Sequence, residues 1–185
     1  MRHKRFVLSA FLIAFCLVGR THLEASLVTH VLVQLPLLAF AGALLVGDKT
    51  IAKNGWNKGG FTALFVALFA IAFCMLPRSI DAALASPLME VAKFVSIPLL
   101  VGVTLKLAWN DAHPLLRGFI KAQTISMLAV LAFVYTHAPV RLCNSYLINE
   151  QEHLGYGFLL VAISLAIYWI SPLLGSQPSA ERGVV

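Results

Sequence analysis

The chain has 185 residues, of which 59% are hydrophobic and only 12% are charged, and its mean hydropathy is +0.85. A water-soluble chain of this length needs more polar surface around its core, so the composition excludes a soluble globular domain and indicates a protein solvated by lipid. The net charge of +6 comes from 14 Lys and Arg residues in short clusters, which excludes a disordered tail and a nucleic-acid module. Three cysteines without regular spacing indicate neither a disulfide framework nor a zinc motif.

Long apolar runs recur along the chain. A membrane-spanning helix needs about 20 mostly apolar residues. On this criterion the sequence predicts an all-α fold, an integral membrane bundle of six transmembrane helices at 6–19, 25–46, 60–76, 88–109, 115–135 and 153–171. Residues 1–171 would form one transmembrane domain, followed by a cytoplasmic tail at 172–185.

The first run is the shortest. Because four basic or imidazole residues precede its 14 apolar residues, it also fits a signal peptide, but no small-x-small cleavage signature follows, which favours an uncleaved helix. The polar segments 47–59, 77–87 and 111–114 are expected to be loops. Pro36 and Pro98 lie inside spans and are expected to kink them.

Basic residues indicate the orientation in the membrane, because Lys and Arg favour the cytoplasmic side. If the N-terminus lies inside, ten basic residues are cytoplasmic and four lie outside, namely Arg20, Arg78, Lys93 and Arg141. Both termini are therefore expected in the cytoplasm.

This topology places several imidazole and sulfur side chains on the outer side: His30, Cys74, Met75, Met89, His137, Cys143 and His153. Imidazole combined with thioether or thiolate suits copper, especially cuprous copper. The candidate metal ligands are His30, Met75, His137 and His153. Histidines at helix ends also commonly cap carbonyl groups or meet lipid headgroups, so a structural role stays open for each.

Other polar residues have both structural and functional explanations. His30 and Gln34 are four residues apart, so they share one stripe of an apolar helix and must face the interior of the bundle. Glu90 and Lys93 are three residues apart, which favours an ion pair of Lys93 with Glu90 or with another acidic residue expected on the outer side, namely Glu24, Asp81, Glu150 or Glu152. Phosphate-loop, zinc-protease, Cys-x-x-Cys and Gly-x-Ser-x-Gly motifs are missing from the sequence, so catalysis is not expected.

Three segments resemble a known family. The segment 75–88, MLPRSIDAALASPL, resembles the Trp-His-x-Pro-x-x-x-Asp-Ala-Ala-Leu-x-x-Pro segment of CtaG-type cytochrome c oxidase assembly factors, membrane proteins linked to copper delivery. Segments 26–32, SLVTHVL, and 148–155, INEQEHLG, are similar to the family's His-Met-x-Gln-His-Leu-Leu and Leu-Glu-Asp-Gln-Gln-Leu-Gly/Ala-Gly. The resemblance covers roughly residues 25 to 171, and its Asp-Ala-Ala-Leu block is the most specific part.

The departures from the family fall at its histidines. His30 is kept, but the others are replaced by Ser26, by Cys74-Met75 and by Ala92-Lys93. Met75 and His153 offer a rearranged copper site, whereas a cationic Lys93 opposes one, because like charges repel strongly in a low dielectric. The resemblance thus implies a protein of the bacterial inner membrane. It would act in copper-oxidase biogenesis or as an accessory subunit of a respiratory or copper membrane enzyme, with the lipid bilayer and oxidase subunits as partners. The alternative is a redox subunit that holds haem b or quinone between His30 and His137 or His153.

Overall fold

The computed structural model describes residues 2–47, 55–138 and 145–175, and in these ranges it contains helices and no strands. In chain order the elements are α1 (Arg2–Val18), α2 (Arg20–Leu23), α3 (Leu27–Thr29), η1 (His30–Gln34), α4 (Leu35–Leu45), η2 (Lys58–Gly60), α5 (Phe61–Cys74), α6 (Pro77–Ala85), α7 (Pro87–Ser96), η3 (Ile97–Val103), α8 (Thr104–Asp111), α9 (Pro114–His137) and α10 (Ile148–Gly175). The η2 segment is a 3₁₀ turn, whereas η1 and η3 are π-helical.

The helices confirm an all-α membrane protein but not six spans. Within the described ranges, four helical stretches are long and apolar enough to cross a bilayer: Leu27–Leu45, Pro87–Asp111, Pro114–His137 and Ile148–Pro172. The stretches Lys58–Cys74 and Arg78–Ala85 are bent by 70° and would make a fifth span only if they are counted together. Helix α1 has 17 residues, or about 26 Å at 1.5 Å per residue, which is shorter than the hydrocarbon core.

Three predicted boundaries differ from the structure. Residues 77–85, expected as a loop, form α6, because Pro77 suits the first turn of a helix and the Ala-rich segment after it has high helix propensity. Helix α10 begins at Ile148, five residues earlier than expected, with Glu150 in its first turn, where a negative charge stabilises the helix dipole. It also continues beyond 171 to Gly175. Residues 48–54 of the predicted loop, Cys143 and the tail from 176 lie outside the described residues.

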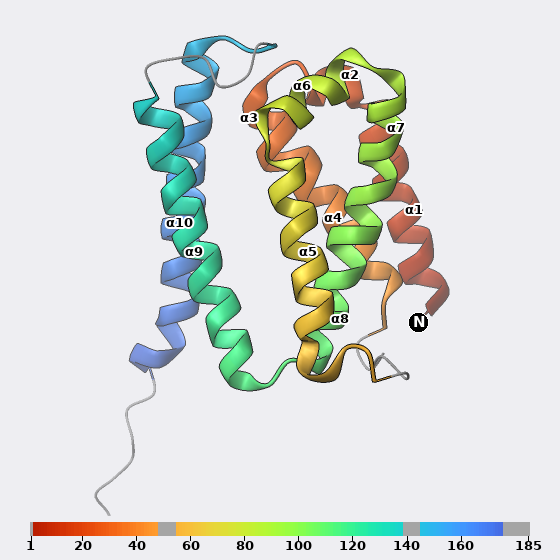
Figure 1. The fold of residues 1–185 in the computed structure, drawn as a ribbon, viewed down its shortest axis with the longest axis vertical. Coiled ribbons are helices and arrows are strands. Elements are labelled where there is room, and N and C mark those ends of the chain that lie inside the picture. The colour runs from red at the N-terminus through yellow and green to blue at the C-terminus, as the bar shows by residue number, and fades with distance from the viewer. Residues whose placement is uncertain (1, 48–54, 139–144, 176–185) are drawn as a thin grey trace, which may run out of the picture.

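The long helices form two groups in Figure 1. Helices α1, α4, α5 and the α7–η3–α8 stretch stand together, and α9 and α10 pack against each other beside them. The short elements α2, α3 and α6 lie at one end of the molecule with the end of α9 and the beginning of α10; we call this the α6 end. The N-terminus, η2, the end of α8 and the beginning of α9 lie at the opposite end, which we call the α8 end.

The tightest contact between helices joins α4 to η3. A Cβ atom added to Gly42 would overlap the carbonyl oxygen of Pro98, and one added to Gly102 would overlap the carbonyl oxygen of Ala39. Both glycines are buried. Small residues at such a crossing let two backbones touch, which maximises van der Waals contact where lipid offers no hydrophobic driving force.

The irregularities expected at the two prolines take the form of π-helical turns. Pro36 lacks the amide hydrogen that would bond to the carbonyl four residues earlier, and η1 ends at Gln34, two residues before it in the helix. Pro98 is the second residue of η3. A π-helical turn rotates the side chains on either side relative to a regular helix, and such turns occur frequently at functional sites.

The glycine crossing gives a direct test. Replacing Gly42 or Gly102 with Ala should destabilise the protein by about 1–3 kcal/mol, because the methyl group would force the two backbones apart. Gly118→Ala on α9 is the matched control, since an added Cβ there meets no atom within 4 Å. That change should be neutral or stabilising by about 0.5–1 kcal/mol through helix propensity. Thermal unfolding in detergent measures all three variants, and equal effects at Gly102 and Gly118 would contradict the proposed crossing.

Candidate functional site

A nearly buried ion pair lies at the α6 end. Nζ of Lys93, on α7, lies 2.5 Å from Oε1 of Glu24, the residue that follows α2. The two side chains are only 6% and 14% exposed. Gln34, fully buried in η1, donates from Nε2 to the same carboxylate oxygen at 3.0 Å. One carboxylate therefore neutralises the cation and also satisfies the amide nitrogen.

The backbone around Glu24 is held by its neighbours. The Thr29 hydroxyl donates to the carbonyl oxygen of Leu23 at 2.7 Å and closes the turn between α2 and α3. The Tyr146 hydroxyl donates to the carbonyl oxygen of Glu24 itself at 2.9 Å. Because Tyr146 comes just before α10, this bond ties the α9–α10 pair to the turn that presents the carboxylate.

The charge of Glu24 is stabilised by these contacts. Burial by itself raises the pKa of the carboxyl group, but the hydrogen bonds from Lys93 and Gln34 and the positive charge of Lys93 outweigh burial, so the pKa of Glu24 lies below its ordinary value. Glu24 is therefore ionised at neutral pH, and the Glu24–Lys93 pair is a true ion pair.

Glu90 does not pair with Lys93 as the spacing of three residues predicted. Its Oε1 accepts from Nη1 of Arg20 at 2.6 Å, and the Arg20 side chain is 48% exposed. Lys93 instead forms its ion pair with Glu24, which is 69 residues away in the sequence. The pair that forms uses another outer-side carboxylate, because the i,i+3 rule considers one helix only, whereas Arg20 on α2 and Glu24 directly after it supply a partner for each charge on α7.

His30 lies beside this network with a defined tautomer. Its Nδ1 lies 3.0 Å from the Tyr146 hydroxyl oxygen, and the ring is 1% exposed. Since the single hydroxyl proton of Tyr146 goes to the Glu24 carbonyl, the hydroxyl oxygen must accept from Nδ1 of His30. In the neutral ring, Nε2 then carries the free lone pair. Among the described residues, no hydrogen bond to this atom is seen.

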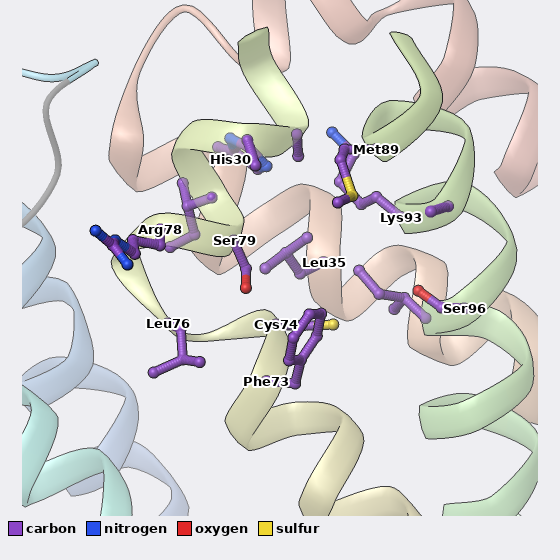
Figure 2. A pocket seen from close by; sticks show the side chains of 15 residues that line it. His30, Leu35, Phe73, Cys74, Leu76, Arg78, Ser79, Met89, Lys93 and Ser96 are labelled. Atoms are coloured by element: carbon purple, nitrogen blue, oxygen red, sulfur yellow. The ribbon is translucent and has the colours of Figure 1, made fainter. Parts of the chain in front are cut away.

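A cavity of about 350 Å³ adjoins the network (Figure 2). His30, Cys74, Met89 and Lys93 contribute to its wall, which is otherwise mostly apolar. Figure 2 shows His30, Met89 and Lys93 toward one side of the cavity and Cys74 toward the other. The cavity therefore combines one imidazole, two sulfur-containing side chains and a neutralised cation in an apolar enclosure.

The structure places the four predicted metal ligands at the α6 end but does not gather them. His137 is exposed, stacks on Phe133 with ring centroids 4.4 Å apart, and contacts the Thr136 hydroxyl through Nδ1 at 2.8 Å. His153 is exposed on α10, and Met75 packs against two apolar clusters. Within the described ranges, no three His, Cys, Asp or Glu side chains are close enough to hold a metal. Of the four, His30 alone lines the cavity.

Two residues of the network were missed by the sequence analysis. Glu24 was named only as one of several outer-side carboxylates, and Tyr146 was not singled out. A signal for Glu24 was present, because an acidic residue directly before an apolar helix is a natural partner for a lone Lys in another apolar helix. No pattern in the sequence pointed to Tyr146.

Comparisons of the chain with protein-family models, curated proteins and solved structures find no match.

Removing one partner of the buried pair should be costly. Lys93→Met leaves the nearly buried carboxylate of Glu24 without its counter-charge, and Glu24→Gln leaves the ammonium unpaired, so each should lower the free energy of unfolding by about 3–5 kcal/mol. Exchanging the charges, Glu24→Lys with Lys93→Glu, should restore much of the loss. The control is Arg20→Gln, which removes an exposed pair worth under about 1 kcal/mol. Thermal unfolding in detergent measures each variant, and a charge exchange no better than either single change would argue against the pair.

The lowered pKa of Glu24 also gives a pH prediction. Its contribution to stability is complete above the ordinary pKa of a carboxyl group and is lost as the pH falls through the lower pKa of the folded state. The unfolding midpoints of the wild type and Glu24→Gln should therefore differ most at neutral pH and converge on acidification. Midpoints measured in one detergent from pH 7 to pH 3 provide the test. A constant difference across this range would mean that ionised Glu24 does not stabilise the fold.

Proposed function

We propose that the chain is a multi-pass membrane protein that serves a copper-containing oxidase, as an assembly factor or accessory subunit, and that it acts by binding that partner without bound metal. The observation that carries the metal-independent part is the Lys93–Glu24 ion pair. The resemblance to oxidase assembly factors supplies the class of partner.

The ion pair supports this proposal through its position. The resemblance aligns Lys93 with a histidine of the family, so an ammonium group stands where an imidazole is expected. A protonated lysine cannot donate a lone pair to a metal, and it brings its own positive charge. Glu24 neutralises the charge of Lys93 inside the bundle, so no bound metal is needed to balance the charge of the carboxylate. The same region is thus stabilised by protein groups alone.

The packing of the resembling segments supports the family part of the proposal. These segments are far apart in the sequence, yet each contributes to one buried apolar cluster at the α6 end: Leu27 and Val31 from 26–32, Ile80 from 75–88 and Leu154 from 148–155. The side chain of Asp81, within the Asp-Ala-Ala-Leu block, accepts from the backbone amide of Ser145 at 3.1 Å. The matching residues therefore form one structural unit.

One observation favours a second candidate, transient cuprous copper binding at His30. Metal-binding histidines characteristically donate their other ring nitrogen to a neighbouring group, as Nδ1 of His30 does to Tyr146. Met89 and Cys74 line the same cavity, and soft sulfur ligands suit cuprous copper. In this case Lys93 is tolerated because Glu24 already neutralises it.

The two candidates are separated by complementation. In a strain that lacks the chain, membranes should have reduced copper-oxidase activity, and expression of the wild type should restore it. The variant His30→Asn/Met89→Leu should restore it equally if no metal is bound, because the Asn amide nitrogen can replace Nδ1 toward Tyr146 while Leu keeps the volume of Met89 and removes its sulfur. Variant abundance is checked by immunoblot.

Other outcomes are equally informative. Restoration by the wild type but not by the double variant would replace the metal-independent proposal with the copper candidate, and tighter binding of cuprous ion by the wild type than by the variant would then be expected. Unchanged oxidase activity without the chain would reject both. A Soret band that stays with the purified chain after its partners are removed would favour the haem alternative.

A further inference from the structure

We infer that the cavity beside the ion pair holds the headgroup of a membrane quinone, whose isoprenoid tail lies in a groove along α5. The inference goes beyond the proposed function and does not depend on the oxidase partner. The site also differs from the quinone position that the sequence suggested, because neither His137 nor His153 lines the cavity.

One side of the cavity opens at the surface of the bundle. Phe73, Leu76 and Met89 line the cavity and are 63%, 51% and 46% exposed, whereas Ile80 and Ile97 on its wall are buried. A lipid-soluble molecule can therefore enter from the bilayer without separating packed helices. The volume of about 350 Å³ suits a substituted ring, since a cavity of about 150 Å³ is large enough for benzene.

A groove continues from the cavity along α5. Its wall contains Phe65, Phe69 and Phe73, which are four residues apart and share one stripe of the helix, together with Leu100 of η3. Phe73 lines both the cavity and the groove, so the two spaces are continuous. All three rings are more than half exposed. The groove thus provides an apolar path from the cavity for a single hydrocarbon chain.

The charges around the cavity favour a neutral headgroup. Lys93 contributes to the wall, but Glu24 neutralises its ammonium group. Arg78 also contributes, and Figure 2 shows its side chain directed away from the cavity. The rest of the wall is mostly apolar, so a phosphate or sugar headgroup would lose its hydration without enough hydrogen bonds in return. These features exclude a phospholipid headgroup and favour an uncharged head with few polar atoms.

Two hydroxyl groups are placed to bind carbonyl oxygens. Figure 2 shows Ser79 of α6 and Ser96 of α7 on different sides of the cavity, with the Ser79 oxygen directed into it. Ser79 is partly exposed, and its hydroxyl makes no hydrogen bond within the described part of the chain, so this donor is open to a ligand. The Ser96 hydroxyl also interacts with the Cys74 thiol. A quinone carries two carbonyl oxygens at opposite edges of one ring, which matches hydroxyl groups on two walls.

Photolabelling measures binding and location together. The full chain in phosphatidylcholine nanodiscs, with a cuprous chelator present, is titrated with an azido-substituted decylbenzoquinone, and the label is located by mass spectrometry after illumination. Wild type should be labelled on α5, α6 or α7. Ser79→Ala removes one hydrogen bond and should weaken binding about fivefold. Ala92→Phe places a ring at an exposed position on the cavity wall and should weaken binding about tenfold or more.

The controls make the same changes away from the cavity. Ser126→Ala and Ala129→Phe alter exposed positions of α9 that line neither the cavity nor the groove, so the affinity should stay unchanged. Unlabelled decylbenzoquinone should displace the label. Dioleoylglycerol, a neutral lipid without a ring, should not displace it.

The remaining outcomes would overturn the inference. Label confined to α9 and α10, or equal affinity of the wild type and Ala92→Phe, would place the quinone elsewhere. Equal displacement by dioleoylglycerol would mean that the cavity takes any neutral lipid, and binding only without the chelator would assign the cavity to copper. Circular dichroism and gel filtration establish that each variant is folded. Unchanged affinity in folded Ser79→Ala would reject the contact between its hydroxyl and a carbonyl oxygen.

Discussion

The contact between Gly42 and Gly102 sets the positions of the polar residues at the α6 end. The two helices run in the same direction from that end. Gln34 precedes Gly42 by eight residues and Lys93 precedes Gly102 by nine, or about 12 and 13 Å along the helix axes. The crossing therefore places Gln34 and Lys93 at nearly the same depth, where one carboxylate from Glu24 reaches both.

An apolar environment makes this arrangement demanding. A charged group inside a membrane bundle is costly unless an opposite charge and hydrogen bonds compensate it. The fold meets that requirement with elements outside the long helices: the turn after α2 supplies Glu24, and the segment before α10 supplies Tyr146. The α6 end is consequently where the α9–α10 pair is joined to the remaining helices by polar contacts as well as by the cluster around Leu27 and Leu154.

The two ends of the molecule use charge differently. At the α6 end the cations Arg20 and Lys93 each pair with a carboxylate of the same chain. At the α8 end Arg117 and Lys121 contact aromatic rings, and the described residues provide no carboxylate for them. The first end thus neutralises these charges with carboxylates, whereas at the second end cation–π contacts hold the two cations.

The sequence by itself determined the membrane class, the approximate positions of the helices and the irregularities at Pro36 and Pro98, because hydropathy and proline geometry are local properties. It also identified His30 and Gln34 as interior polar residues, since such groups cannot face lipid. Only the tertiary structure decided their partners. Lys93 pairs with Glu24, 69 residues away in the sequence, and His30 hydrogen-bonds to Tyr146, 116 residues away. The packing of the helices and the turn after α2 bring those atoms together. It likewise decided that His30, His137 and His153 form no three-residue cluster, because His30 is buried in the bundle while His137 and His153 are exposed on their helices.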